Sequence, residues 1–268
     1  MKKNYTITVS NIKGGIGKTT IALVLATSLA EKGYKVLAVD SDPQSNLTDY
    51  LLPDVDTVEN RCLIQALDGT KEVSDCIWDT KYETLKVLPS DVDLAGTIYH
   101  LSEKGNLMFY QMFETEPVNK DPDDKRAYLD YDFIIIDTAA AMNTMLYNAF
   151  SASDMVICPT ASDMKSIKGI LQTIQTCTDL TRSMPSAVRK KLTFKVVCNQ
   201  LGRNKIEKEQ ISDLKNMIGD RLMNTTIRFQ AKPLKEADRR GVPVTSLNYA
   251  VSEEYKQFVD EIESEVVR

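Results

Sequence analysis

A short run of glycine, lysine and threonine near the start of the chain could bind phosphate. It reads Lys13-Gly-Gly-Ile-Gly-Lys-Thr-Thr20 and lies between an apolar segment and a helical pattern. Glycines let a backbone approach an anion, and a helix N-terminus presents N–H groups to it. Lys18 would then supply a charge to the β- and γ-phosphates, and Thr19 a hydroxyl ligand for Mg²⁺. The standard GxxxxGK[ST] pattern is not met, because Ile12 stands where its first glycine belongs.

Three aspartates at the ends of apolar runs could act on the same phosphates. Asp137 ends Phe133-Ile-Ile-Ile-Asp, where a carboxylate could hold a Mg²⁺-bound water. Asp40 and Asp42 lie two residues apart at the end of another such run. Simpler alternatives stay open: Asp137 as a buried aspartate satisfied by neighbouring N–H groups, and Asp40 or Asp42 as a turn residue before Pro43.

Short β-branched runs alternate with helical patterns along the whole chain. This alternation predicts an α/β fold, a mostly parallel twisted sheet flanked by helices, in one domain over residues 1–268. The expected strands are Tyr5–Asn11, Lys35–Asp40, Leu85–Pro89, Phe133–Asp137, Met155–Pro159, Phe194–Asn199 and a weaker Thr225–Phe229. The expected helices are Thr19–Lys32, Lys165–Arg182, Lys205–Leu222 and Glu253–Val267. The polar segment Asn119–Arg126 is expected to be a surface loop.

Composition excludes several classes of protein. No stretch approaches the roughly 20 apolar residues that cross a bilayer, and the N-terminus runs directly into a strand pattern, so the prediction is a cytoplasmic protein. The five cysteines are widely spaced without a CxxC pair, which argues against a metal site and a disulfide framework. Cys158 and Cys198 lie in strand patterns and are expected to be small buried hydrophobes. His100, the only histidine, has no catalytic neighbours in sequence.

The charge of the chain is unevenly distributed. The whole chain carries −5, whereas Arg182–Arg240 holds 15 Lys and Arg against six Asp and Glu, a local balance of +9. A basic region of this kind can bind a phosphate backbone even in an acidic protein. A solvated helical face explains the same charges equally well.

Four motifs, in order, carry a resemblance to a known family. The Lys13–Thr20 loop is similar to the KGGxGKTT signature of the ParA/MinD group, whose loop is a deviant Walker A motif. Val36–Asn46 resembles the group's DxDPQxN motif, Phe133–Thr138 its Walker B strand, and Pro233–Val244 its closing EA…GxPV segment. These matches span nearly the whole chain. It most resembles the ParA partitioning ATPases, in the short form without an N-terminal helix-turn-helix.

The resemblance implies ATP and Mg²⁺ as cofactors and gives roles to the site residues. The phosphate loop would comprise Lys13, Gly14, Gly15, Ile16, Gly17, Lys18, Thr19 and Thr20. Lys13 matches the lysine that reaches the partner subunit's nucleotide in an ATP-sandwich homodimer, and Asp42 the residue that positions the attacking water. Asp40 matches a residue near the metal and the loop, Asp137 one that binds Mg²⁺ through water, and Asn199 one that contacts adenine.

The resemblance also implies non-specific DNA binding by the ATP-bound dimer. Arg203 sits where relatives carry a DNA-contacting arginine, and the basic region supplies further candidates: Arg189, Lys190, Lys191, Arg239 and Arg240. A ParB-like centromere-binding protein would stimulate the weak intrinsic ATP hydrolysis, and the ATP state would lie on the nucleoid. The expected function is partitioning of a plasmid or chromosome.

Other members of the group suggest two further functions. MinD-like relatives act at membranes through a basic terminal helix, but Ser252–Arg268 has six acidic and two basic residues and an apolar stripe. MinD-like positioning of a protein cargo stays an alternative. The nitrogenase iron protein, another member of the group, transfers electrons and needs two cysteines per subunit at a shared cluster. No cysteine closely follows Asp137 in this sequence, because Ala139–Ala141 occupy that place. Relatives commonly carry a proline pair there, so we expect a more flexible γ-phosphate-sensing loop.

Overall fold

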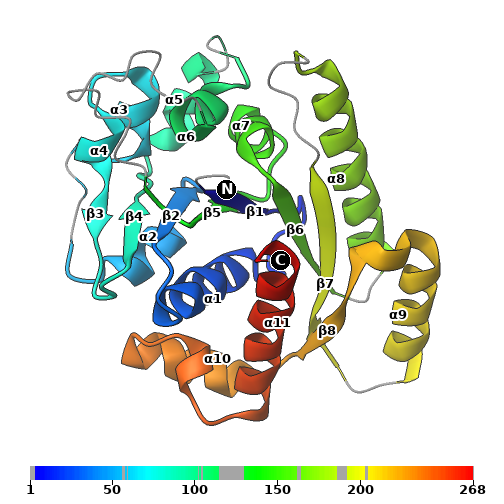
Figure 1. Cartoon of the computed structure of the whole chain (residues 1–268). Coiled ribbons are helices and arrows are strands. Elements are labelled where there is room, and N and C mark those ends of the chain that lie inside the picture. Colours follow the sequence, from blue (N-terminus) through cyan, green and yellow to red (C-terminus); the bar gives the residue numbers. More distant parts are fainter. Residues whose placement is uncertain are drawn as a thin grey trace.

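An eight-stranded β-sheet forms the centre of the chain in this computed structural model. The structure describes residues 4–55, 58, 60–101, 103, 105–114, 130–161, 164–185, 192–202 and 205–267. The strands are β1 (Tyr5–Val9), β2 (Val36–Ser41), β3 (Trp78–Asp79), β4 (Leu85–Leu88), β5 (Phe133–Thr138), β6 (Met155–Thr160), β7 (Thr193–Leu201) and β8 (Leu222–Arg228). They lie in the order β3-β4-β2-β5-β1-β6-β7-β8 (Figure 1). All neighbouring pairs are parallel except β3 and β4.

The central strands are buried because helices cover both faces of the sheet. Every residue of β2, β5 and β6 is buried, as expected for parallel strands that never face water. The predicted α/β sheet and its seven strands are confirmed, although β8 begins at Leu222, three residues earlier than expected. The two-residue strand β3 was not predicted. Cys158 and Cys198 are fully buried in β6 and β7, as expected.

Eleven α-helices are found among the described residues. They are α1 (Lys18–Glu31), α2 (Asn46–Leu51), α3 (Leu63–Asp68), α4 (Val73–Cys76), α5 (Leu94–Leu101), α6 (Met108–Glu114), α7 (Thr144–Ala152), α8 (Met164–Ser183), α9 (Lys205–Ile218), α10 (Ala231–Arg240) and α11 (Ala250–Val266). The 3₁₀ turn η3 (Gly219–Arg221) leads from α9 into β8, and η4 (Val244–Ser246) lies between α10 and α11. In Figure 1, α1, α10 and α11 lie on one side of the sheet, and α5 to α8 lie on the other.

In two of the predicted helices, the apolar residues that formed the sequence pattern are the ones buried in the core. In α1, Ile21, Leu25 and Leu29 repeat every four residues and are all fully buried. In α11, the predicted apolar stripe packs into the core, with Phe258 and Ile262 fully buried. Acidic residues of α11 bond to β8, to Lys195 of β7 and to Lys32 beyond the end of α1. The predicted helix Lys205–Leu222 is wrong at its end, since α9 stops at Ile218 and Leu222 already belongs to β8.

In the described part of the chain, no helix is both long enough and apolar enough to span a membrane. The expected surface loop Asn119–Arg126 lies outside the described residues.

Candidate nucleotide site at the carboxyl edge of the sheet

The phosphate loop leaves the end of β1 and leads into α1 at the middle of the sheet. Gly15 and Gly17 adopt φ values of +74° and +82°, which residues other than glycine rarely adopt. Ile16 is buried and anchors the loop. Lys18 is the first residue of α1, and its Nζ donates to the carbonyl oxygen of Lys13 at 3.3 Å. The loop therefore has the backbone that anion binding requires.

Side chains of strand β7 hydrogen-bond to the phosphate loop. Asn199 Nδ2 donates to the Ile16 carbonyl at 2.8 Å, and Gln200 Nε2 donates to the Gly15 carbonyl at 3.0 Å. A Cβ added at Gly17 would lie 2.5 Å from Asn199 Nδ2. Gly17 is thus required both by its backbone angle and by this approach. Asn199 Oδ1 is buried and has no partner among the described residues, so the predicted contact with adenine stays a prediction.

A further residue, Asn11, was missed by the sequence analysis. Its Nδ2 donates to the Pro159 carbonyl at 2.9 Å, and its Oδ1 accepts from the Lys13 backbone N–H at 3.0 Å. Asn11 is fully buried. The fully buried amide therefore ties the backbone of Lys13 to the end of β6. An asparagine just after a strand was the available signal, but it does not reveal a partner so distant in sequence.

Asp40 and Asp137 stand side by side in the sheet. The register of the parallel strands β2 and β5 pairs their Cα positions, and both side chains are fully buried. Burial raises the pKa of Asp40 to about 6 against the effect of its hydrogen bonds. Burial, and next the charge of Asp40, raises the pKa of Asp137 to about 8. Two buried carboxylates without a cation between them resist ionisation.

Among the described residues, no hydrogen-bond partner is found for one oxygen of Asp137. Its Oδ1 accepts from the Thr138 N–H at 3.1 Å, whereas Oδ2 is buried without a partner. The alternative of an aspartate fully satisfied by N–H groups is therefore wrong. The Thr19 hydroxyl and the Lys18 ammonium act to lower the pKa of Asp137, so both side chains lie close to it. Such a group of hard oxygens beside a phosphate loop suits a magnesium ion.

Asp42 lies in the turn after β2. Its Oδ1 accepts from the Gln44 N–H at 3.0 Å, so it does form the turn that Asp-Pro sequences favour. This structural role leaves Asp42 half-exposed at the same edge as the loop. Burial lowers the pKa of the Lys18 ammonium, and the charges of Asp137 and Asp42 oppose that shift. One lysine thus faces two aspartates across the site.

The loop after β5 lies near the phosphate loop. A Cβ built on Gly14 would lie 4.0 Å from the Cβ of Ala140. The loop ends where Asn143 caps α7, its Oδ1 accepting from the Leu146 N–H at 3.1 Å. Ala140 would therefore be within van der Waals distance of a side chain at Gly14, and its place in a γ-phosphate-sensing segment stays a prediction. The effect of alanines in place of prolines stays a prediction.

The closing segment of the chain packs against the start of α1. Thr19 and Thr20 line a cavity of about 160 Å³ together with α2, α10 and η4. Asn46 and Tyr50 come from α2, while Ala237 and Val244 come from the EA…GVPV segment. The EA…GVPV segment therefore lies beside the start of α1 in the fold, although the two are more than 200 residues apart in the sequence.

Comparison with known proteins places the chain in a family. A family model described as an AAA domain matches residues 4–193. The chromosome partitioning protein ParA of Caulobacter vibrioides is 28% identical over 259 residues, which cover 96% of this chain and 92% of that protein. The chain belongs to the ParA family of partitioning ATPases.

Solved structures agree on the fold. The apo McdA structure of Cyanothece superposes with a TM-score of 0.81 at 21% identity and covers 96% of this chain and 99% of that one. A putative plasmid partition protein of Borrelia burgdorferi bound to AMPPNP has a TM-score of 0.80 at 22% identity, with 98% and 99% coverage. This ParA-family chain is thus a P-loop ATPase with a mostly parallel sheet.

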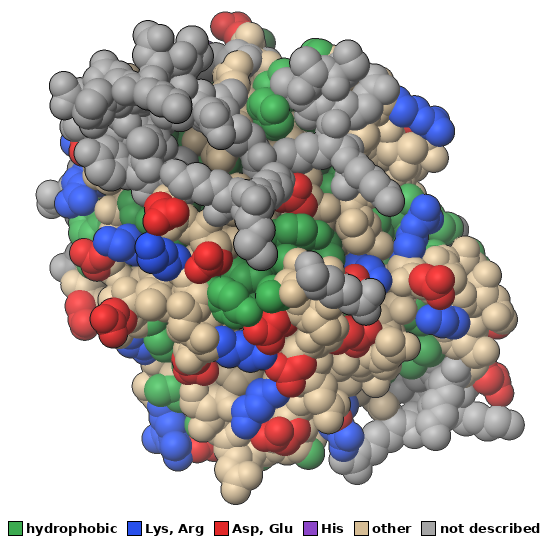
Figure 2. Space-filling model, in the orientation of Figure 1, with side chains coloured by type: hydrophobic (Ala, Val, Ile, Leu, Met, Phe, Trp, Pro, Cys, Tyr) green, Lys and Arg blue, Asp and Glu red, His purple; other side chains and the backbone are tan. Residues whose placement is uncertain are grey.

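The predicted DNA-contacting residues are only partly placed. Arg189, Lys190, Lys191 and Arg203 lie outside the described residues. Arg239 and Arg240 are exposed on α10, where Arg240 pairs with Glu236 at 2.5 Å. Figure 2 shows basic and acidic side chains interspersed on the face that carries the termini, so the described side chains visible there form no purely basic surface.

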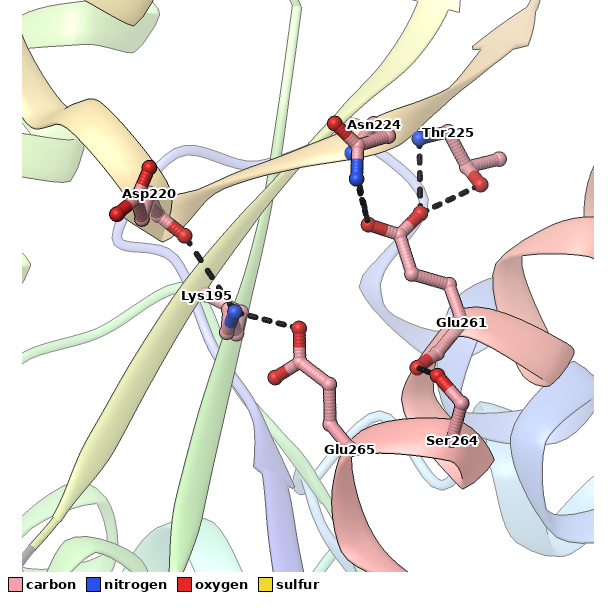
Figure 3. Close-up of polar contacts among 7 residues, drawn as sticks. All are labelled: Lys195, Asp220, Asn224, Thr225, Glu261, Ser264 and Glu265. Carbon is pink, nitrogen blue, oxygen red and sulfur yellow. Dashed lines mark hydrogen bonds and ion pairs between the residues drawn. The ribbon is translucent and has the colours of Figure 1, made fainter.

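The basic region of this ParA-family chain is also partly neutralised by the acidic helix α11. Lys195 Nζ contacts Glu265 at 2.6 Å and the Asp220 carbonyl at 3.4 Å (Figure 3). Arg228 pairs with Glu254 of the same helix. The local balance of +9 in the sequence therefore overstates the positive charge that this region offers to a ligand.

Proposed function

We propose that this ParA-family ATPase is an ATP-controlled switch that binds DNA and partitions a plasmid or chromosome. The observation that carries the proposal is the deviant loop Lys13–Thr20 at the same sheet edge as the buried pair Asp40 and Asp137. Full-length similarity to a chromosome partitioning protein supports the biological process. The remaining steps rest on individual residues.

ATP would lie with its phosphates in the loop. Gly14 to Gly17 offer backbone N–H groups, and Lys18 compensates the β- and γ-phosphate charge. The Thr19 hydroxyl and, through water, the unpaired Asp137 oxygen would hold Mg²⁺. Among the described residues, no cluster of three His, Cys, Asp or Glu side chains could hold a metal by itself, which suits an ion that arrives with the nucleotide. Mg²⁺ would neutralise phosphate charge.

Hydrolysis would need both this chain and a second copy. Asp42 would orient the attacking water, and Lys13 of the partner subunit would stabilise the charge that develops on the phosphates. The Asn11 bond to the Lys13 backbone fixes the base of that lysine. Weak intrinsic turnover follows, since the second charge is present only in the dimer.

DNA binding would follow dimer formation in the ATP state. Arg203, Arg189, Lys190 and Lys191 stay candidates, together with Arg239, for which the described residues offer no carboxylate within ion-pair distance. Contacts of this kind weaken with salt, because they release counterions from the phosphate backbone. A ParB-like partner would then stimulate hydrolysis and release the DNA.

The test is binding to non-specific duplex DNA at two salt concentrations. It compares no nucleotide, ADP, ATP, and ATP with the Asp42→Ala variant. Binding that requires ATP, persists in Asp42→Ala and weakens with salt is the expected result. Arg203→Ala together with Lys190→Ala should reduce it, whereas Lys256→Ala, on the acidic helix α11, should not.

A second candidate function is the positioning of a protein cargo, with or without a membrane surface. The similarity to the McdA structure favours it, as does the 26% identity to a carboxysome distribution protein of Synechococcus elongatus. Absence of DNA binding in every nucleotide state would reject DNA partitioning. That outcome would favour a protein or membrane cargo and leave the ATPase assignment intact.

A further inference from the structure

The turn that carries Asp42 is held at both ends by one buried side chain. The turn leaves β2 at Ser41 and enters α2 at Asn46. Within it, the Asp42 carboxylate accepts from the Gln44 N–H, the Asp42 carbonyl accepts from the Ser45 N–H at 2.9 Å, and Ser45 adopts a left-handed φ of 53°. The direction of the Asp42 carboxylate therefore depends on how the backbone of this turn is fixed.

Asp40 closes the turn. Its Oδ1 accepts from the Asp42 N–H at 3.1 Å, at the start of the turn. Its Oδ2 accepts from the Thr48 N–H at 2.9 Å and from the Thr48 hydroxyl at 2.8 Å, beyond the end of the turn. Three hydrogen bonds to one fully buried carboxylate thus define the path of residues 42–48.

Thr48 connects this closure to the rest of the sheet. Its hydroxyl donates to Asp40 and also accepts from the Ser90 N–H at 2.9 Å, two residues beyond the end of β4. Thr48 is only 6% exposed, so water cannot replace either bond. Loss of the hydroxyl would leave a buried carboxylate oxygen with one donor fewer and a buried N–H without its acceptor.

We propose that Thr48 is a positioning residue for ATP hydrolysis, acting through Asp40 on the backbone of Asp42. The proposal deepens the proposed function, because it rests on the assignment of Asp42 to the attacking water. Thr48 lies at the far end of the turn from Asp42 and contacts it only through Asp40. It therefore affects where Asp42 points rather than whether ATP binds. Small displacements of an orienting group are costly, since a shift of about 1 Å can cost about 100-fold in rate.

The experiment compares Thr48→Val with Thr48→Ser. Valine keeps the shape and removes both hydroxyl bonds, whereas serine keeps both bonds. We expect Thr48→Val to lower kcat for ATP by about tenfold or more with KM within about twofold. Thr48→Ser should keep kcat within about twofold of the wild type. Equilibrium binding of a fluorescent ATP analogue should be unchanged in both variants.

Thr27→Val is the matched control. Thr27 is also fully buried, and its hydroxyl donates to the Leu23 carbonyl at 2.7 Å within α1. It should lose stability without a selective loss of kcat. If Thr48→Val does not fold, Thr48→Ala with Thr48→Ser provides the same comparison. Equal kcat effects at Thr48 and Thr27, or no rescue by serine, would overturn the proposal.

The role of Asp42 is tested separately in the same assays. Full turnover by Asp42→Ala would reject the Asp42 assignment, and the Thr48 proposal with it. Failure of DNA binding would reject DNA partitioning but leave the ATP kinetics of the Thr48 variants fully informative. The two failures are therefore distinguishable.

Discussion

Two carboxylates in different regions of this protein, those of Asp137 and Glu261, are bonded in opposite ways. At the carboxyl edge, Asp137 is fully buried, one of its oxygens has no partner in the described part of the chain, and burial raises its pKa to about 8. On the α11 side, both oxygens of Glu261 accept hydrogen bonds from Asn224 and Thr225 of β8 (Figure 3). Burial acts to raise the pKa of Glu261, but these bonds outweigh it, and the pKa is lowered.

The difference separates a group held for a ligand from a group held for stability. A buried polar atom without a partner destabilises the protein, and native structures keep few of them. Asp137 and Asn199 both have such an atom beside the phosphate loop. Glu261 has none, and its bonds fix the last helix to the last strand. Variants of the first region should therefore change activity, and variants of the second should change stability.

The largest effect is expected at Asp137. Asp137→Asn should lower ATP turnover by about 100-fold, because the amide cannot compensate the charge of a metal ion. The unfolding free energy of the nucleotide-free protein should stay equal or rise, because the amide need not be protonated, or buried as a charge, when the chain folds. Phosphate release and urea unfolding measure the two quantities. Asp132→Asn, at the opposite end of β5, is the control and should leave turnover unchanged. A loss of stability with normal turnover in Asp137→Asn would contradict the comparison.

Gly17→Ala should have the next largest effect. The new Cβ would face both a φ of +82° and the Asn199 amide at 2.5 Å, so we expect ATP affinity to fall about tenfold through displacement of the loop. Gly33→Ala is the matched control, because its φ of +91° is equally left-handed but no atom lies within 4 Å of the added Cβ. It should lose about 1 kcal/mol of stability without a change in ATP affinity. Equal affinities for both variants would show that the Asn199 contact is dispensable.

A smaller effect, on stability alone, is expected at Glu261. Glu261→Gln should lower the unfolding free energy by about 1–2 kcal/mol at pH 7 with unchanged turnover. Because the folded pKa lies below the ordinary value of 4.5, the unfolded state takes up protons more readily. The stabilisation is therefore fully present above that value and is lost as the pH falls through the folded pKa. Urea unfolding at pH 7 and near pH 4 should show the difference between wild type and variant shrinking. A constant difference would mean that the charge of Glu261 is not what binds β8.

The smallest effect is expected at Lys256. It pairs with Glu253 at 2.7 Å on the exposed side of α11, and such pairs contribute at most about 0.5 kcal/mol. Lys256→Ala should thus be nearly silent in urea unfolding and in turnover. A loss as large as that of Glu261→Gln would show that α11 is held by its general charge rather than by its bonds to β8.

The sequence analysis was most successful where one segment carried the whole signal. The Ile134-Ile-Ile136 run and the four-residue repeat of α1 need no information from elsewhere in the chain, and both elements formed as predicted. Helices α2 to α4 have six residues or fewer, too few turns to show a helical period. Strand β3 has two residues and no alternation to detect.

The site was predictable in kind but not in its long-range contacts. Glycine, lysine and aspartate at strand ends indicated a nucleotide site. The matching of Asp40 with Asp137 depends on the register of β2 against β5, across about a hundred residues of chain. The support of the loop by Asn199 and the pairing of Lys195 with Glu265 depend on equally distant segments. Local patterns do not contain such information.

The bonds from α11 to β8 have a consequence for how copies of this protein can associate. An unprotected edge strand is a template on which another chain can add a strand. Here β8 ends the sheet, and its N–H groups at Asn224, Thr225 and Arg228 are already taken by Glu261 and Glu254. The sheet is closed to extension along this stretch of its edge. A dimer or filament therefore cannot be built by continuing the sheet past those residues of β8.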